Sequence, residues 1–141
     1  MSDTALMNPK IVFIKNDSNE LLRCDATVVK SENQCDIYKS SNDPIVIQSN
    51  KTSVINTNLS IKVPPDYYIK IILGQKSQNY NNSVYLVNDS IKSNTNMSDN
   101  LFTPLNFVVH NNSSCNYNLY NGDKLATLIL VKIESYDISF Q

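Results

Sequence analysis

Apolar residues recur at every second position in short runs along almost the whole chain. Because the side chains of a β-strand alternate between two faces, this period is typical of half-buried strands. No window keeps the i, i+3, i+4, i+7 pattern of an amphipathic helix over three turns. The runs are rich in Ile, Val and Tyr, and clusters of Asn, Ser, Asp and Pro separate them. We predict strands at Lys10–Lys15, Ala26–Lys30, Pro44–Gln48, Ser53–Asn56, Leu59–Val63, Tyr67–Leu73, Val84–Val87, Pro104–His110, Tyr117–Tyr120, Leu125–Ile133 and Tyr136–Phe140.

Length and composition restrict the class of protein. The 141 residues fit one domain, 1–141, and 41% hydrophobic with 18% charged residues is ordinary for a folded protein. A net charge of −1 with scattered lysines predicts no nucleic-acid partner, and the absence of a long apolar stretch predicts no membrane partner. The segment Met1–Pro9 lacks the pattern of a secretion signal, and three cysteines without metal-ligand spacing fit a reducing compartment. We therefore expect an intracellular protein that is not secreted.

Two turns and one loop have a clear local signature. Asn121-Gly122, between two predicted strands, predicts a β-hairpin because both residues tolerate positive φ. Pro64-Pro65-Asp66 predicts a strand break, with Asp66 able to adopt a left-handed conformation. The polar stretch Asn88–Thr103 is the longest irregular segment, and we expect it to be mobile or to cover a pocket. His110 is the only histidine, which excludes a multi-histidine metal site and favours an ordinary half-buried strand residue.

Three stretches, in order, resemble motifs of one family. Cys35–Ser40 resembles G-Y-D-L-Y-S, and Asn50–Tyr68 resembles P-G-E-x-x-x-V-x-T-G-I-x-I-x-L-P-P-G-Y-Y. Asn121–Val131 resembles G-D-R-I-A-Q-L-I-L. Over roughly Lys10 to Phe140 the chain thus resembles the trimeric dUTPase (deoxyuridine triphosphatase) family. The resemblance implies a jelly roll or distorted β-barrel of short, mostly antiparallel strands, with Asp36, Tyr38, Pro64, Pro65, Tyr67, Gly122 and Asp123 as motif-matched scaffold residues.

The resemblance also implies an active site between subunits. In the family a divalent metal holds the triphosphate, an aspartate activates water and a C-terminal arm closes over the nucleotide. The family's second motif, R-S-S/A-G, supplies phosphate donors at a helix start. Here Lys76-Ser77 could replace Arg-Ser only with two inserted residues, since Gly74-Gln75 stands there otherwise.

Other catalytic positions also differ. Against G-V-I-D-x-x-Y-R-G, Ser98 stands at the aspartate, Leu101 at the tyrosine and Phe102 at the arginine, while Asp99 is one residue away. Thr127 replaces the fourth motif's glutamine, and the arm motif is absent after the last predicted strand. Lys76, Ser77, Ser98, Asp99, Leu101 and Thr127 would line a degenerate former nucleotide site. We therefore expect a pseudoenzyme without catalytic residues, without a cofactor and without dUTP hydrolysis.

The functional expectation is a non-catalytic homotrimer that acts as a protein-interaction or structural protein. Residues 134–141 would form a strand swapped to a neighbouring subunit. The excess of Asn, Lys and Ile, with two glycines and no tryptophan, fits an AT-rich and viral genome. The end Ile138–Gln141 lacks the apolar last residue that a PDZ groove takes, so that class of partner is disfavoured. The alternative is a divergent dUTPase or nucleotide sensor that still binds deoxynucleotide with Mg²⁺ through Lys76, Ser77 and Asp99; a weaker one is a virion or inclusion component.

Overall fold

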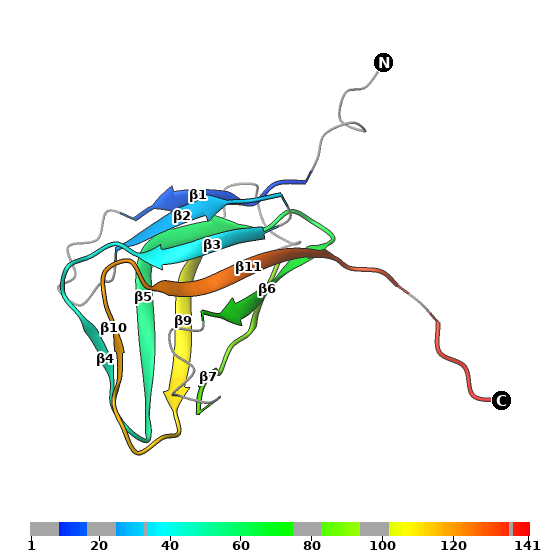
Figure 1. Ribbon diagram of the computed structural model, residues 1–141. Helices are drawn as coiled ribbons and strands as arrows, with labels where there is room; N and C mark the ends of the chain where they lie inside the picture. Colours follow the sequence, from blue (N-terminus) through cyan, green and yellow to red (C-terminus); the bar gives the residue numbers. More distant parts are fainter. Residues whose placement is uncertain (1–8, 17–24, 33, 75–82, 94–101, 136) are drawn as a thin grey trace.

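The computed structural model describes residues 9–16, 25–32, 34–74, 83–93, 102–135 and 137–141, and within these ranges the only regular elements are β-strands (Figure 1). None of the described residues forms a helix long and apolar enough to cross a membrane. The strands are β1 Val12–Lys15, β2 Ala26–Lys30, β3 Gln34–Lys39, β4 Ile45–Ile47, β5 Lys51–Lys62, β6 Tyr67–Leu73, β7 Val84–Leu86, β8 Ser90–Lys92, β9 Thr103–Asn111, β10 Tyr117–Leu119 and β11 Lys124–Lys132.

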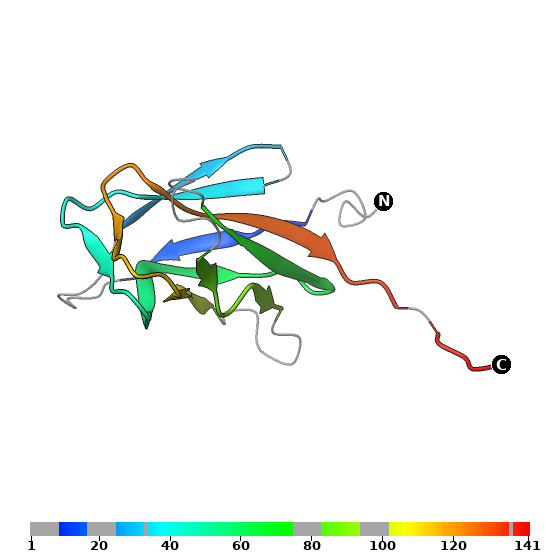
Figure 2. The ribbon, with the colours of Figure 1, turned by 60° about the horizontal axis from the view of Figure 1, so that its bottom comes forward.

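The strands form antiparallel sheets in two main layers (Figure 2). One sheet has the order β1-β5-β9-β7, the other has the order β2-β3-β11-β6-β8, and β10 pairs with β4 in a third, two-stranded sheet. The sheets do not close into a barrel. The all-β jelly-roll expectation is confirmed, while the distorted barrel is replaced by open sheets.

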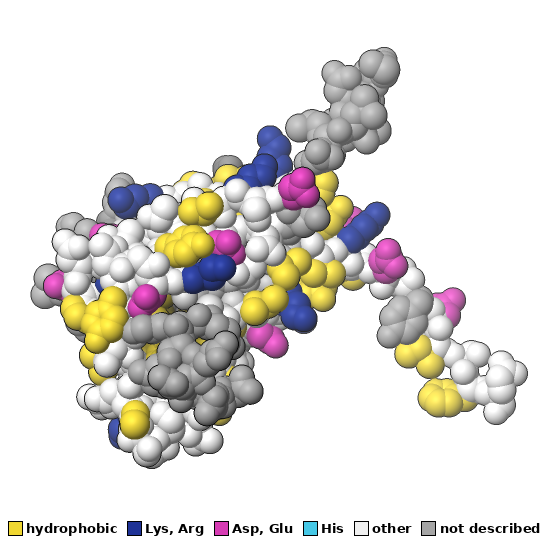
Figure 3. All heavy atoms as spheres, viewed as in Figure 1, with side chains coloured by type: hydrophobic (Ala, Val, Ile, Leu, Met, Phe, Trp, Pro, Cys, Tyr) yellow, Lys and Arg dark blue, Asp and Glu magenta, His cyan; other side chains and the backbone are white. Residues whose placement is uncertain are grey.

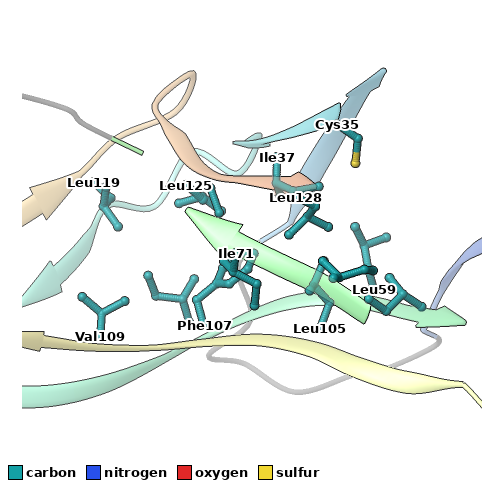
Figure 4. Close-up of a cluster of buried hydrophobic side chains, with 14 of the residues drawn as sticks. Cys35, Ile37, Leu59, Ile71, Leu105, Phe107, Val109, Leu119, Leu125 and Leu128 are labelled. Carbon is teal, nitrogen blue, oxygen red and sulfur yellow. The ribbon is translucent and has the colours of Figure 1, made fainter. Parts of the chain in front are cut away.

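The core lies between the two large sheets and follows from the period of two. On β9, Leu105, Phe107 and Val109 are buried, and the residues between them point outward. They face Ile37 of β3 and Leu128 of β11 from the opposite layer (Figure 4). Each such side chain contributes about 1.5–3 kcal/mol when it leaves water, so this apolar sandwich holds the two layers together.

The predicted hairpin at Asn121-Gly122 is wrong. A turn does form there, and Gly122 has a φ of 93°, but β10 pairs with β4 while β11 pairs with β3 and β6. The turn is attached to the end of β3, because the Gly122 amide donates to the Lys39 carbonyl and the Lys39 amide donates to the Asp123 carbonyl. It therefore transfers the chain from one sheet to another.

Most predicted strands are found, with some differences. Two predicted strands, Ser53–Asn56 and Leu59–Val63, are one strand, β5, whose pairing with β9 shifts register between Asn56 and Ser60. The strand β8 lies within the stretch that we expected to be irregular. The predicted strand at the C-terminal end is absent among residues 137–140, and residue 136 lies outside the described residues. The periodicity also missed β3, in which polar residues alternate with Cys35 and Ile37.

Three of the described residues other than glycine have a positive φ. Asn50 (58°) precedes β5, Asn58 (62°) lies at its register shift, and Asp66 (68°) precedes β6. The expected turn before β6 is confirmed, because the Tyr67 amide donates to the Pro64 carbonyl at 3.3 Å. Asn and Asp are the residues that best tolerate this region after glycine.

Candidate functional site

A cluster of polar side chains lies on the outer face of the five-stranded sheet, where β3 and β11 are neighbours. Asp36 and Thr127 are opposite each other in the register, and the Thr127 hydroxyl donates to Asp36 Oδ1 at 2.7 Å. Lys124 Nζ lies 3.7 Å from Asp36 Oδ2 and 5.8 Å from the centroid of the Tyr38 ring. Figure 3 views this face, where acidic, basic and hydrophobic side chains gather over β3 and β11. We call Asp36, Tyr38, Lys124 and Thr127 the Asp36 cluster.

Alternation along β3 places this carboxylate outside the core. Cys35 and Ile37 are buried, so Asp36 and Tyr38 point to the opposite face. The side chain of Asp36 is only 15% exposed, against 38% for Lys124. Both oxygens of Asp36 therefore face a donor or a cation within a half-covered surface, where charges interact more strongly than in bulk water.

Apolar residues continue the row of side chains on both sides of the cluster. Val29 of β2 is the register partner of Asp36, and Ile72 of β6 is the register partner of Thr127. These two side chains are 47% and 44% exposed. The cluster thus combines a carboxylate, a hydroxyl and an ammonium group with apolar surface that a ligand or another chain could cover.

The neighbouring thiol does not belong to the site. Cys35 points into the core, and burial, followed by the nearby Asp36 charge, raises its pKa to about 11. A thiol with this pKa stays protonated near neutral pH, whereas the nucleophilic and metal-binding form is the thiolate. Cys35 therefore acts as an apolar core residue.

The cluster can contribute to a cation site but cannot form one alone. The described residues contain no group of three or more His, Cys, Asp or Glu side chains arranged to hold a metal ion. Mg²⁺ that accompanies nucleotides is usually bound by one or two carboxylates together with phosphate oxygens. Asp36 fits that limited role, with its orientation maintained by Thr127.

The backbone leaves no space for a side chain at position 74, which stands at the motif arginine when no residues are inserted. The Gly74 amide donates to the Leu125 carbonyl at 2.9 Å, and a Cβ at position 74 would lie 2.0 Å from the Lys124 carbonyl oxygen. Without movement of the backbone this position cannot carry an arginine. The alternative candidates, Lys76 and Ser77, lie outside the described residues.

The remaining predicted positions are distributed as follows. Ser98, Asp99 and Leu101 lie outside the described residues. Asp123 Oδ2 accepts from the Tyr120 amide at 2.7 Å, a contact that stabilises the turn. The scaffold residues Pro64, Pro65 and Tyr67 form the turn before β6 and the start of that strand. The structure brings together Asp36, Tyr38 and Thr127, and it adds Lys124, which the motif comparison did not single out.

Comparison with known proteins identifies the fold. No protein-family model matches the chain, and no curated protein matches it. Among solved structures, it is similar to the dUTPase of Staphylococcus bacteriophage 80alpha, with a TM-score of 0.65 and 12% identity. A point mutant of the dUTPase from S. aureus phage phi11 has a TM-score of 0.62 and 16% identity, and EIAV dUTPase has 0.56 and 17%. In each case the match covers 94% of this chain and 96% of the other. This chain has the dUTPase fold.

One expectation must be corrected. The sequence led us to expect a pseudoenzyme, but the structural neighbours of this chain are dUTPases, which are enzymes. The expectation relied on mismatches in the second, third and fourth motifs and on the missing arm motif. The second and third motifs include residues 75–82 and 94–101, which lie outside the described residues, and a side chain at position 74 would meet the backbone of β11.

The backbone conformation supports the dUTPase resemblance more strongly than the residue identities in the motifs do. When the Pro-Pro-Gly-Tyr-Tyr end of the family stretch is placed on Pro64–Tyr68, its three glycines fall on Asn50, Asn58 and Asp66. These are the three non-glycine residues with positive φ among the described residues. At each position where the family stretch has a glycine, this chain thus has the left-handed conformation that glycine adopts most readily.

Proposed function

We propose that this chain is an intracellular viral protein that forms a homotrimer of dUTPase fold and binds a deoxyuridine nucleotide at the Asp36 cluster. The observation that carries the proposal is the contact between Asp36 and Thr127, at 2.7 Å. It joins the stretch that resembles G-Y-D-L-Y-S to the stretch that resembles G-D-R-I-A-Q-L-I-L on one face of the sheet. The Staphylococcus phage neighbours include dUTPases studied with dUpNHpp, and the phi11 structure is described as containing a structural Mg(II) ion. Those properties belong to the neighbours and motivate the proposal for this chain.

Each residue of the cluster has a distinct role in this proposal. Asp36 provides the carboxylate for a divalent cation that accompanies the phosphates. Thr127, whose hydroxyl donates to Asp36 Oδ1, keeps that carboxylate oriented. A family glutamine at position 127 would reach further, so this shorter side chain favours support of Asp36 over direct contact with the nucleotide.

Binding to a non-hydrolysable dUTP analogue with Mg²⁺, measured by calorimetry, tests the proposal. We expect Asp36→Asn to weaken binding at least about tenfold, since a charged hydrogen-bonding partner contributes roughly 1.5–3 kcal/mol. Asp43→Asn, in an exposed loop, is the matched control and should bind as the wild type does. Equal affinity of both variants, or no binding by the wild type, would refute the proposal. Pyrophosphate release from dUTP in parallel samples distinguishes a divergent dUTPase from a nucleotide-binding sensor.

Two features favour the homotrimer. Among the described residues, one outward face carries no charged side chain where β5, β9 and β7 lie side by side. It consists of Thr52, Val54 and Asn56 in the first half of β5, Asn106, Val108 and His110 on β9, and Tyr85 on β7. The His110 Nδ1 atom and the Thr52 hydroxyl are 2.7 Å apart, and the His110 and Tyr85 ring centroids are 5.4 Å apart. Thr52 and His110 thus satisfy each other across the strand pair, which lowers the cost of covering this part of the face with another subunit.

The C-terminal segment is the second feature. After β11 the chain leaves the sheets and extends away from them (Figure 1), and the side chains of Ile138 and Phe140 are 73% and 96% exposed. Residues two apart share one face of an extended chain, so these two could pack together on a neighbouring subunit. Deleting residues 134–141 should then dissociate the trimer, as measured by light scattering at micromolar concentration. A monomeric full-length chain, or a deletion variant that stays trimeric, would contradict this part of the proposal.

A protein-interaction role is the second candidate function. Phage dUTPases similar to this chain are described as controlling transfer of virulence genes by a proto-oncogenic G protein-like mechanism. The exposed tail with Phe140 offers this chain a similar opportunity to contact a partner. Pull-downs from the native source with and without nucleotide test the role, and a partner that is retained equally without the tail would exclude this surface. Co-purification with particles would indicate a virion component instead.

A further inference from the structure

The turn between β10 and β11 contains Asn121-Gly122, the only Asn-Gly pair in this asparagine-rich chain. Both residues are exposed, and apart from its chain neighbours no heavy atom lies within 4 Å of the place where a Cβ on Gly122 would lie. Glycine has no side chain to hinder attack by its amide nitrogen on the side chain of the preceding asparagine. The turn therefore places a chemically reactive pair where water has access to it.

One hydrogen bond restrains the attacking nitrogen of this pair. The Gly122 amide donates to the Lys39 carbonyl at 2.7 Å, and Lys39 is a buried residue, so water does not readily replace this acceptor. The asparagine side chain is held far less firmly, because its Nδ2 atom lies 3.5 Å from Asn42 Oδ1, its one contact among the described residues. An amide nitrogen attacks only when it can give up its proton, so the bond to Lys39 keeps the pair unreactive.

Three further hydrogen bonds keep the same turn closed. The Lys39 amide donates to the Asp123 carbonyl at 2.9 Å, and the Asp123 amide donates to the Tyr120 carbonyl at 3.0 Å. The Tyr120 amide in turn donates to Asp123 Oδ2 at 2.7 Å. These bonds share residues with the bond of the Gly122 amide, so that amide is released only when the turn opens as a unit.

We propose that Asn121 is a site of spontaneous covalent modification, which the hydrogen bond from the Gly122 amide to Lys39 suppresses until the turn opens. The Gly122 nitrogen then forms a bond to Asn121 Cγ, and the bond from Cγ to Nδ2 breaks. The amide proton leaves with the side-chain amine as ammonia. Water opens the resulting succinimide ring at one of its two carbonyls and leaves either aspartate or isoaspartate at position 121.

The isoaspartate product would not fit the turn. Its main chain runs through the former side chain, so one extra carbon atom separates the Asn121 position from Gly122. The Gly122 amide and the Asp123 carbonyl could then no longer bond to Lys39 at the same time, and β11 begins at the next residue, Lys124. A chain that has reacted therefore closes the turn less well than one that has not, and each opening carries a risk of permanent change.

The experiment incubates the full-length protein at mildly alkaline pH, folded in buffer and unfolded in urea, and follows isoaspartate at position 121 by peptide mapping and mass spectrometry. We expect the folded protein to react about ten- to hundredfold more slowly, since opening the turn breaks its bonds to Lys39. Asp123→Ala removes the acceptor of the Tyr120 amide, so it should react several-fold faster than the wild type when folded and equally fast in urea. Asn42→Ala, which removes only the 3.5 Å contact, is the control and should react as the wild type does.

Each outcome decides one part of the proposal. Isoaspartate that accumulates in urea mainly at other asparagines would overturn Asn121 as the site. Equal rates in the folded and unfolded protein, or a folded Asp123→Ala variant that reacts no faster than the wild type, would show that closure of the turn gives no protection. Circular dichroism confirms that the variants are folded in buffer. Hydrogen exchange of the Gly122 amide tests the same point without a mutation, because fast exchange in the folded wild type would also refute protection.

Discussion

Replacing Asn58 with glycine should stabilise the protein. Asn58 has a φ of 62°, is 2% exposed, and its Oδ1 atom has no hydrogen-bond partner among the described residues. The left-handed backbone costs about 1 kcal/mol for a residue with a Cβ, and a buried unpaired carbonyl costs at least about 1 kcal/mol. Glycine removes both costs but loses about 1 kcal/mol of extra chain entropy on folding. The net expectation is a gain of about 1 kcal/mol, or roughly 3 °C in Tm.

Thermal and urea unfolding at matched protein concentration measure this effect, and two control variants separate its causes. Asn58→Ala removes the carbonyl and avoids the entropy cost of glycine but keeps a Cβ at positive φ, so the same estimates place its stability close to that of Asn58→Gly. Asn106→Gly removes a second Oδ1 atom that lacks a described partner, at an ordinary φ. It should therefore gain about 1 kcal/mol less than Asn58→Gly. If all three variants have the same stability, positive φ at position 58 is not a source of strain and the reasoning fails.

Three further perturbations have definite expected outcomes. Gly74→Ala should destabilise the fold by about 3 kcal/mol or more in urea unfolding, because its Cβ would lie 2.0 Å from a carbonyl oxygen of β11; a smaller loss would mean that the strands separate easily. A thiol reagent at pH 8 should label the exposed Cys115 and leave Cys35 unlabelled until unfolding. Because the folded Cys35 pKa is raised from 9.0 to about 11, its contribution to stability should be complete below pH 9 and should decline as the pH rises to 11. Val54→Lys should dissociate the proposed trimer in light scattering, whereas Val29→Lys, on the other large sheet, should not; equal behaviour would place the proposed subunit contact elsewhere.

Sequence periodicity predicted strands well where one face is apolar and the other is polar or solvated. The strand β6 has the predicted bounds, Tyr67–Leu73, because Ile69 and Ile71 alternate with exposed residues. Periodicity failed to predict the bounds of β5, where Thr57, Asn58 and Ser60 are buried polar residues around the register shift. Periodicity cannot anticipate such burial, because it depends on hydrogen bonds such as that from the Thr57 hydroxyl to the Leu105 carbonyl.

Turn chemistry predicted the position of a turn but not the strands that it joins. Asn121-Gly122 does reverse the chain, yet its neighbours pair with other strands because the Gly122 amide and the Asp123 carbonyl bond to Lys39. The same limit applies to the candidate site. Motif letters identified Asp36 and Thr127, but only the register of β3 against β11 places them in contact. Lys124 was missed because a lysine in the sequence carries no sign of which side chain it pairs with.

The close approach at Gly74 has an evolutionary consequence. Positions 74 and 124 are in backbone contact, so a change at one position limits what the other can become. A side chain at position 74 would require the start of β11 to lie further from the end of β6, and moving that start would also move Lys124 and disturb the Asp36 cluster. Among relatives of this chain, positions 74 and 124 are therefore expected to vary jointly.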